Sequence, residues 1–386
     1  MTSAPRISVI VPTCNRPSFL MHALESIRRQ TFTDYEIIVV DDGDNDVTHR
    51  LLEPSCGERF LYLHTNRRGL AAARNIGMQA ARGHFFAFLD DDDQWLPGKL
   101  SAQIAVLERC PEVALVHCGY RIVNDNDKPI KEVRAEARKW AYQQLLAWNS
   151  IAASSVILRS EAARTSGGFD EQLSGCADWD LWLRIARDHP IEYCDEILTL
   201  YRIHGNNMHK NIAGMERETF LILEKHAMHL AREQYTSLRA THAVRLARDY
   251  YRVGNRAACL RLLTDALLED PTCSLLMHEL SVEEQEHLIG DALSTLRSAI
   301  HDTQQHRTYQ RAAAKQYHLL AWVYYHQNRM ADFRRCLRNV FQYRFPHIPF
   351  RLLVPYLKSF FGKRVSDALH TLRTRLTNKH AGFRFL

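Results

Sequence analysis

Four consecutive carboxylates, Asp90–Asp93, are the strongest chemical feature of this 386-residue sequence. They directly follow the apolar run Phe85–Leu89, which predicts a buried strand. Four acids at one strand end repel one another unless a cation or a positive dipole offsets them. Because no Cys or His cluster lies nearby, their oxygen ligands favour Mg²⁺ or Mn²⁺ over Zn²⁺. The alternative is a solvated acidic turn that caps a helix beginning at Pro97.

Two further acids, Asp41 and Asp42, follow a second apolar run, Glu36–Val40. The Asp-Gly pair that comes next is also typical of a simple turn. However, the carboxyl ends of parallel strands meet at one crevice, where ligands bind in open α/β sheets. One acid could then contact a base or ribose while another holds a metal.

The elements around these acids predict an α/β fold. Apolar runs rich in β-branched residues predict strands at Ile7–Val11, Glu36–Val40, Phe60–Leu63, Phe85–Leu89 and Val113–His117. Apolar residues at helical spacing predict helices at Pro17–Gln30, Leu70–Ala81 and Pro97–Cys110. This alternation predicts a mainly parallel sheet covered on both faces.

From about Met215 onward only helical patterns remain, and we therefore predict two domains, 1–212 and an all-α accessory domain at 213–386. Tyr251–Pro271 and Tyr324–Pro346 resemble two copies of one helix-turn-helix unit of the tetratricopeptide (TPR) type. The alternatives are plain helical packing and a peptide-binding array.

The formal net charge of +6 is concentrated in the tail, since residues 1–215 carry 24 basic and 28 acidic side chains whereas 346–386 carry 8 and 1. The tail pattern predicts either a docked helical hairpin or a stretch that contacts a membrane surface or a protein partner. Without basic-aromatic interleaving, we expect no nucleic acid partner.

Nine cysteines with no C-x-x-C pair predict free thiols in a reducing compartment. The chain has no signal-like segment and no apolar run of about 18 residues. We therefore expect a cytoplasmic protein, with the tail as a possible peripheral contact at the inner face of the membrane.

Several segments, in order and spacing, resemble the family 2 glycosyltransferases of the GT-A fold. They are ISVIVPTCNRP, YEIIVVDDGDND, NRRGLAAARNIGMQAARGHFFAFLDDDDQWLPGKL, CADWDLWLRIA and YRIHGNNMH, which lie within the first 210 residues. The resemblance implies inverting transfer of a sugar from a nucleotide diphosphate donor, foremost a UDP-sugar, to an acceptor hydroxyl. The acceptor is left open among glycans, lipid-linked glycans and proteins.

The same resemblance implies how the donor is held. Pro12 and Thr13 would lie near the base and ribose, Asp42 at the base edge, and Arg74 near the nucleotide or its diphosphate. Arg74 could instead be a surface cation on a helix.

The family's Asp-x-Asp motif falls within the four acids. Alignment on the following Trp-Leu-Pro makes Asp92 the main ligand of Mn²⁺ or Mg²⁺, with Asp90 or Asp91 on the ribose or a metal-bound water. This register is ambiguous by one position.

Asp178 occupies the position of the family's general base, although Ala177 replaces the usual preceding Glu. The alternative role for Asp178 is that of an ordinary acid at a helix start. The missing Glu motivates a second hypothesis, a non-catalytic scaffold that binds nucleotide-sugars and recruits partners through its helical domain.

Arg202 and His204 follow a predicted strand, Ile197–Tyr201, and resemble family residues near the donor diphosphate or the metal. His204 could instead be an ordinary satisfied histidine. The segment Asn124–Ser150, with Trp140, Tyr142 and Trp148, predicts either internal packing or an acceptor-binding loop.

Overall fold

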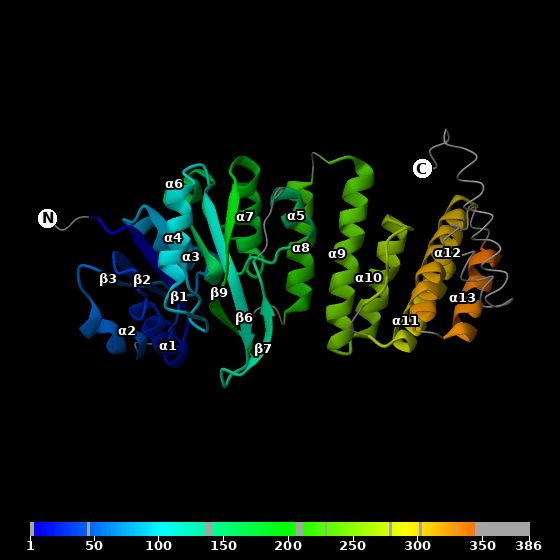
Figure 1. Cartoon of the computed structure of the whole chain (residues 1–386), viewed down its shortest axis with the longest axis horizontal. Helices are drawn as coiled ribbons and strands as arrows, with labels where there is room; N and C mark the ends of the chain where they lie inside the picture. The colour runs from blue at the N-terminus through cyan, green and yellow to red at the C-terminus, as the bar shows by residue number, and fades with distance from the viewer. Residues whose placement is uncertain are drawn as a thin grey trace, which may run out of the picture. The chain divides into compact units, whose positions relative to one another are not determined.

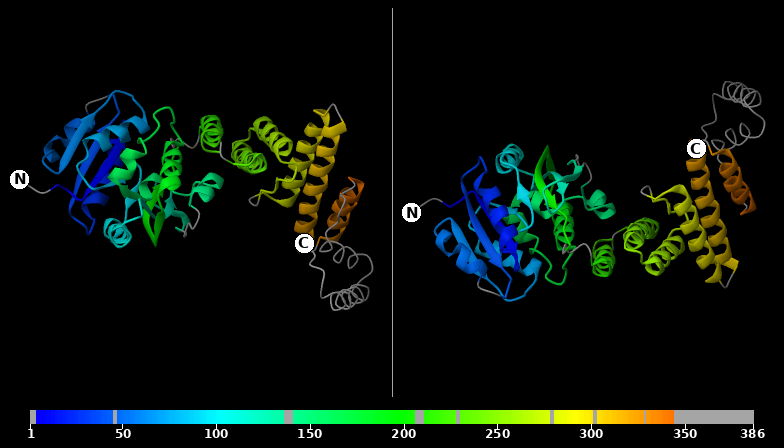
Figure 2. Two further views of the ribbon diagram at one scale, coloured as in Figure 1. Left: turned by 90° about the horizontal axis from the view of Figure 1, so that it is seen from above. Right: turned by 90° about the horizontal axis from the view of Figure 1, so that it is seen from below.

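The computed structural model divides the chain into two compact units, Met1–His229 and Leu230–Leu386. The residues that the structure describes are 4–44, 47–135, 141–205, 211–227, 230–277, 280–300, 303–327 and 329–343. The predicted basic tail, Pro346, Trp140 and the end of the YRIHGNNMH segment lie outside these residues. Figures 1 and 2 show one sheet flanked by helices in the first unit and helices alone in the described part of the second.

One sheet runs through the first unit in the order β3-β2-β1-β4-β8-β6-β9-β5, with β7 paired to β6. Its strands are β1 (Ile7–Thr13), β2 (Tyr35–Asp41), β3 (Phe60–His64), β4 (Phe85–Phe88), β5 (Gln94–Trp95), β6 (Leu115–Val123), β7 (Pro129–Val133), β8 (Val156–Arg159) and β9 (Ile191–Arg202). The predicted strands at the start of the chain are all present in the sheet.

The sheet is mixed rather than mainly parallel. Strands β1 to β4 pair in parallel, but β8 lies antiparallel to both β4 and β6. β6 then pairs with β9 in parallel. The prediction failed here because β8 has only four residues, too few for a periodic pattern to distinguish a strand from a helix segment.

Helices cover the sheet and present apolar faces to it. The helices of this unit are α1 (Pro17–Arg28), α2 (Val47–Leu52), α3 (Leu70–Ala80), α4 (Lys99–Arg109), α5 (Ala141–Ala147), α6 (Ser160–Thr165), α7 (Ala177–Asp188) and α8 (Ile212–His226), with 3₁₀ turns at Glu53–Ser55 and Ala153–Ser155. Gly77 permits a close approach of α3 to the sheet, because a Cβ there would lie 2.5 Å from Ile10 Cγ2. α3 is thereby held against β1.

The register of the parallel strands brings the predicted acids together. Thr13 pairs with Asp41 across β1 and β2, and Ile10 pairs with Phe88 across β1 and β4. The residues that follow these strand ends therefore emerge at one edge of the sheet. This edge carries Asp42 and Asp90–Asp93.

The division between the units falls after His229, not at the expected residue 212, because α8 belongs to the first unit. Glu218 of α8 is bonded to the loop that precedes α7, and His226 Nε2 lies 2.9 Å from Asp180 Oδ1 on α7. Asp180 is fully buried and also forms an ion pair with Arg184 at 2.7 Å. Burial alone would raise the pKa of Asp180. The hydrogen bonds and ion pairs with its basic partners lower it by more, so the pKa lies well below its usual value.

The second unit is helical throughout its described residues. It contains α9 (Arg232–Arg252), α10 (Arg256–Glu269), α11 (Val282–Ser298), α12 (Thr303–His326) and α13 (Met330–Gln342). α9 packs on α10, and α12 packs on α13, as antiparallel pairs. The turn between α9 and α10 uses Gly254 at φ +76°, a conformation that favours glycine.

The predicted unit Tyr251–Pro271 covers the end of α9 and all of α10, and the described part of Tyr324–Pro346 covers the end of α12 and all of α13. That the two are copies of one unit stays a prediction. Their TPR-like character and any peptide partner stay predictions. Among the described residues, no helix is both long and apolar enough to cross a membrane.

Candidate active site

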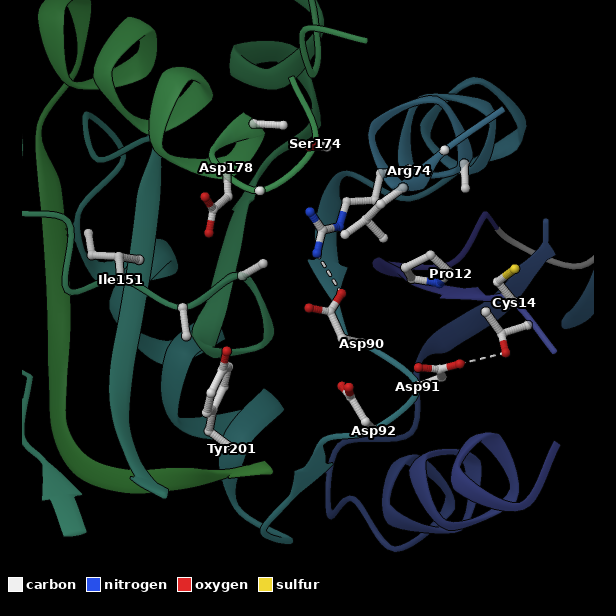
Figure 3. A pocket seen from close by; sticks show the side chains of 18 of the residues that line it. Pro12, Cys14, Arg74, Asp90, Asp91, Asp92, Ile151, Ser174, Asp178 and Tyr201 are labelled. Carbon is white, nitrogen blue, oxygen red and sulfur yellow. Dashed lines mark hydrogen bonds and ion pairs between the residues drawn. The ribbon is translucent and has the colours of Figure 1, made fainter. Parts of the chain in front are cut away.

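A cavity of about 610 Å³ opens where the strand ends meet in the first unit. Figure 3 shows it from close by, with Asp178 on one side and Pro12, Cys14 and Asp91 on the other. Eight of the ten predicted site residues line it, namely Pro12, Thr13, Asp42, Arg74, Asp90, Asp91, Asp92 and Asp178. The fold therefore brings together residues that are up to 166 positions apart in the sequence.

Asp42 organises the loop that leads into α3. Its Oδ1 accepts hydrogen bonds from Thr65 Oγ1 at 2.6 Å and from the Arg68 backbone N–H at 2.7 Å. Its Oδ2 accepts from the Gly69 N–H at 2.7 Å. Gly69 lies at φ +92°, which a side chain would make unfavourable. The carboxylate is thus buried and fixed at the cavity wall.

Arg74 lies at the centre of the cavity. Figure 3 shows its guanidinium pointing between Asp90 and Asp178. Nη2 donates to Asp90 Oδ1 at 2.5 Å, and the guanidinium carbon lies 5.2 Å from the centroid of the Phe169 ring. Its buried Nε has no hydrogen-bond acceptor among the described residues. Arg74 is therefore a buried cation that lines the cavity and not a surface charge.

Asp91 is buried and is held by two neighbours. Its Oδ2 accepts from Thr13 Oγ1 at 2.7 Å, and its Oδ1 lies 3.2 Å from Arg16 Nη1. Burial raises the pKa of Asp91 to about 7, with repulsion from Asp92 adding to the effect and Arg16 opposing it. Arg16 was not predicted as a site residue, although it lies in the quoted ISVIVPTCNRP segment.

The Asp92 carboxylate is held by an arginine and a histidine. Its Oδ2 lies 3.0 Å from Arg16 Nη1 and 2.9 Å from His204 Nε2. The His204 ring stacks on Phe19 at 5.2 Å between centroids. His204 is buried behind Asp92 and is not among the cavity-lining residues of the described chain. It therefore contacts the predicted metal ligand, while its own ligation of a metal stays a prediction.

Arg202 also lies behind the four acids. Its backbone N–H donates to Asp93 Oδ1 at 2.9 Å, and its Nε donates to the Asp92 carbonyl at 3.0 Å. Nη2 donates to Asp127 Oδ1 at 2.6 Å. Arg202 is 3% exposed and does not line the cavity. A contact with a donor diphosphate would need these bonds to rearrange.

The fourth acid, Asp93, is buried beneath the cavity floor. Its Oδ2 has no hydrogen-bond partner among the described residues. Burial, together with repulsion from Asp92 and Asp90, raises the pKa of Asp93 well above its usual value. Asp93 is not among the described residues that line the cavity, so Asp90–Asp92 are the acids that face it.

Asp178 stands in the first turn of α7 and faces the same cavity. Its Oδ1 accepts the Trp179 N–H at 2.6 Å. Burial raises the pKa of Asp178 to about 6, while the Arg74 cation opposes this rise. A carboxyl group of this kind is suited to accept a proton near neutral pH.

The Glu218 carboxylate, on α8, accepts hydrogen bonds from the N–H groups that directly precede α7. Glu218 Oε1 accepts from the Ser174 N–H at 2.9 Å and from Ser174 Oγ at 2.6 Å. Its Oε2 accepts from the N–H groups of Gly175 and Cys176, both at 2.9 Å. Glu218 is 2% exposed. No local sequence pattern indicates this contact, because it links residues 42 to 44 positions apart.

Aromatic and aliphatic side chains form the remaining wall of the cavity. They are Tyr120 and Ile122 of β6, Tyr201 of β9, and Trp148 and Ile151 of the segment after α5. The Tyr120 and Tyr201 rings lie 5.7 Å apart. Of these residues only Trp148 had been considered for acceptor binding.

The carboxylate oxygens of the cavity are the candidate ligands for a divalent metal. In the described part of the chain, no group of three or more His, Cys, Asp and Glu side chains is arranged to hold a metal ion. Asp90 and Asp92 nevertheless present carboxylates to the cavity, as Figure 3 shows. Mg²⁺ is commonly bound by one or two carboxylates together with waters and substrate phosphates. The residues therefore fit a metal that shares its coordination with a diphosphate.

Residues 8–160 match the family model described as "Glycosyl transferase family 2". A UDP-Glc:alpha-D-GlcNAc-diphosphoundecaprenol beta-1,3-glucosyltransferase of Escherichia coli, WfgD, is 30% identical over 208 residues, which cover 53% of this chain and 80% of WfgD. The chain therefore belongs to the family 2 glycosyltransferases.

An uncharacterized glycosyltransferase of Rickettsia prowazekii is 30% identical over 209 residues, covering 52% of this chain and 65% of that protein. Across five Rickettsia relatives, the matched region spans only 37% to 65% of their length.

Solved structures give weaker likenesses. A crystal structure of Staphylococcus aureus TarS residues 1–349 with UDP-GlcNAc has a TM-score of 0.45 and 16% identity, covering 89% of this chain and 93% of that one. The mannosyltransferase PcManGT of Pyrobaculum calidifontis, with GDP-Man and Mn²⁺, has a TM-score of 0.44 and 17% identity, covering 94% of this chain and 89% of that one. Scores below 0.5 support no conclusion about this chain.

Proposed function

We propose that this protein transfers a sugar, with inversion, from a nucleotide diphosphate donor to an acceptor hydroxyl in the synthesis of a cell-surface glycan or glycoconjugate. The observation that carries the proposal is that Asp178 faces the same cavity as Asp42 and Asp90–Asp92. A general base and a nucleotide-holding wall are thus within reach of one bound donor. A UDP-sugar is the first candidate, because UDP-Glc is the donor that the name of WfgD gives.

The donor would lie along the wall formed by the β1 and β2 ends. Pro12 and Thr13 flank the base and ribose, and the fixed carboxylate of Asp42 accepts a hydrogen bond from the base edge. Arg74, with its unused Nε, is placed to donate to the diphosphate. Charge on the leaving diphosphate would then be stabilised by a preorganised cation.

Asp92, assisted by Asp90, would hold Mn²⁺ or Mg²⁺ against the diphosphate. When bound, such a metal acts as a Lewis acid that stabilises the negative charge of the departing nucleotide diphosphate. Arg16, which bridges Asp91 and Asp92, keeps these acids compensated before the donor arrives.

Asp178 would act as the general base. Its carboxylate takes the proton of the acceptor hydroxyl as the acceptor oxygen bonds to the anomeric carbon of the sugar. The bond between that carbon and the diphosphate oxygen breaks in the same displacement, so the configuration inverts. The raised pKa of Asp178 favours this proton transfer.

A second candidate is a non-catalytic scaffold that binds nucleotide-sugars, which Ala177 in place of the family's Glu favours. Metal-dependent UDP binding without turnover of any donor, including hydrolysis, would support it. One observation speaks against the scaffold hypothesis. The Glu218 carboxylate accepts four hydrogen bonds from the residues directly before Ala177, so a carboxylate is present beside the position where the family Glu is missing.

We also propose that the enzyme works in a reducing, cytoplasmic compartment, because all nine cysteines are free thiols in the structure. The helical unit is proposed as an accessory domain that contacts a partner, an acceptor or the membrane surface.

The function is tested by a screen of nucleotide-sugars for Mn²⁺-dependent thermal stabilisation, followed by assays of donor hydrolysis and transfer. A ligand at a hundred times its dissociation constant adds about 2.7 kcal/mol to the free energy of unfolding. We expect one donor, foremost a UDP-sugar, to stabilise the protein and to be consumed. Stabilisation without consumption would favour the scaffold, and no stabilisation by any donor would contradict both proposals.

A further inference from the structure

The uncharged wall of the cavity has a composition that suits a ligand of its own. Tyr120, Ile122, Trp148, Ile151 and Tyr201 come from three separate parts of the chain and meet beside Asp178. Figure 3 shows Ile151 and Tyr201 on the Asp178 side, away from Pro12 and Cys14. We call these five side chains the aromatic wall.

Trp148 is the most exposed member of the aromatic wall. Its surface is 46% exposed, although Trp is highly buried on average. It is nevertheless anchored, because its backbone N–H donates to the Gln144 carbonyl at 2.8 Å. Trp179 Nε1 also donates to the Leu145 carbonyl at 2.8 Å, which ties α5 to the helix that carries Asp178. An exposed indole on an anchored backbone, beside a proposed base, is suited to stack on a ligand.

The two tyrosines add polar groups that the protein leaves open. Neither the Tyr120 nor the Tyr201 hydroxyl has a hydrogen-bond partner among the described residues, and Figure 3 shows the Tyr201 oxygen pointing toward Asp178. Burial and the nearby acids raise the pKa of both phenols, so they stay protonated donors. Half-buried hydroxyl groups without protein partners are satisfied by water or by a ligand.

The charges of the cavity limit what this ligand can be. The cationic side chains that line it are Arg16 and Arg74, and both are paired with acids on the opposite wall. The aromatic wall therefore offers no cation to a phosphate, and the acids Asp90 and Asp178 would repel one. A neutral ring with an apolar face fits the aromatic side chains of this wall. Several hydroxyl groups on that ring would accept hydrogen bonds from the two phenols.

We propose that the aromatic wall is an acceptor subsite for a neutral pyranose ring, which stacks on Trp148 and receives hydrogen bonds from Tyr120 and Tyr201. This inference rests on the proposed function, because the pyranose hydroxyl would deliver its proton to Asp178. It narrows the acceptor from any hydroxyl compound to the terminal sugar of a glycan.

The test uses the full chain with the donor found in the screen. Donor hydrolysis without acceptor is measured first, because it reports on the donor side of the cavity alone. The proposed function itself would be overturned if the chain neither hydrolysed the donor nor transferred its sugar to any acceptor tested. Transfer is then measured to methyl pyranosides of glucose, galactose, mannose and N-acetylglucosamine. Ribitol phosphate and a Ser/Thr peptide serve as the competing acceptor classes.

We expect transfer to at least one pyranoside, and Trp148→Ala to raise the KM for that acceptor by about tenfold with donor hydrolysis unchanged. Tyr201→Phe, which keeps the ring, should raise the same KM by a smaller factor of about three to ten. Ile130→Ala is the matched control, since Ile130 is 60% exposed on β7 and does not line the cavity.

Three results would overturn the proposal. One is an unchanged pyranoside KM in both Trp148→Ala and Tyr201→Phe. Another is an equal loss of donor hydrolysis in Trp148→Ala, which would place the indole on the donor side. The third is transfer to ribitol phosphate or to the peptide while no pyranoside is used.

Discussion

The two sides of the cavity, which we propose hold the sugar donor and the acceptor, differ in how their polar groups are satisfied. On the donor side, the carboxylates of Asp42, Asp90, Asp91 and Asp92 each have donors within the protein. On the acceptor side, Asp178 accepts one hydrogen bond, from its neighbour Trp179, and the phenols of the aromatic wall donate none among the described residues. The carboxylates of the first surface therefore already have hydrogen-bond donors, whereas the polar groups of the second keep unused hydrogen-bonding capacity.

This difference separates two tasks. A diphosphate brings several negative charges, so the surface that meets it must already hold cations and fixed acids in place. A neutral acceptor instead needs an unoccupied base and unused hydrogen-bond donors near its reacting hydroxyl. The comparison predicts that substitutions on the two sides change different steps of the reaction.

The largest effect is expected on the donor side. Asp92→Ala should lower kcat/KM by about a thousandfold, because a metal contributes several kcal/mol to the stabilisation of the leaving diphosphate. Mn²⁺-dependent donor binding, followed by calorimetry, should weaken in parallel. Asp188→Ala is the control, since Asp188 is a surface acid of the same unit. Unaltered Mn²⁺ binding in Asp92→Ala would remove this residue from the metal site.

A substitution between the two sides should separate positioning from binding. Glu218→Ala leaves the N–H groups of Ser174, Gly175 and Cys176 without their acceptor, so the free energy of unfolding should fall by about 3 kcal/mol. The turnover number should fall at least about tenfold while the donor KM stays within about threefold.

Urea unfolding and steady-state kinetics measure these two effects of Glu218→Ala. Glu218→Gln, which keeps one carbonyl oxygen, should recover part of both losses. The control Glu161→Ala removes an exposed acid and should change neither the free energy of unfolding nor the turnover number. A donor KM that rises as much as kcat falls would show that Glu218 supports the donor side instead of Asp178.

The smallest effect is a pH dependence. Asp178 faces Arg74 and Asp90 across the cavity and lies near the Tyr120 phenol, and burial raises its pKa to about 6. The protonated acid cannot accept a proton, so the transfer rate should fall about tenfold per pH unit as the pH drops below this pKa. Donor binding by calorimetry over the same range separates this loss from a weaker donor complex. A transfer rate that stays flat from pH 7 to pH 5 would contradict the assignment.

The donor side was largely predictable from the sequence. Asp42 and Asp92 follow strands, and Arg74 lies in a helix, whose patterns are local. The ends of parallel strands must also meet at one edge of a sheet. The mixed character of the sheet was not predictable, because the short strand β8 pairs with β4 across about seventy residues of sequence. Its direction depends on that pairing and leaves no periodic pattern in four residues.

The acceptor side depended more on contacts between distant segments. Glu218 and Tyr120 carry no local mark of their role, and only the packing of α8 and β6 brings them beside Asp178. Arg202 shows the opposite failure, since its motif was found but its guanidinium donates to carbonyls behind the site. Sequence patterns indicate which residues can do chemistry, whereas burial and pairing decide which of them face the ligand.

The most direct test of the two-sided site is Asp178→Asn, assayed for donor binding and for transfer on the same preparation. Calorimetry with donor and Mn²⁺ should give a dissociation constant within about threefold of the native value. Single-turnover transfer should fall by about a hundredfold to ten-thousandfold, the range that a general base contributes. Full transfer with unchanged binding would contradict the account, as would a parallel loss of both, which would place Asp178 on the donor side.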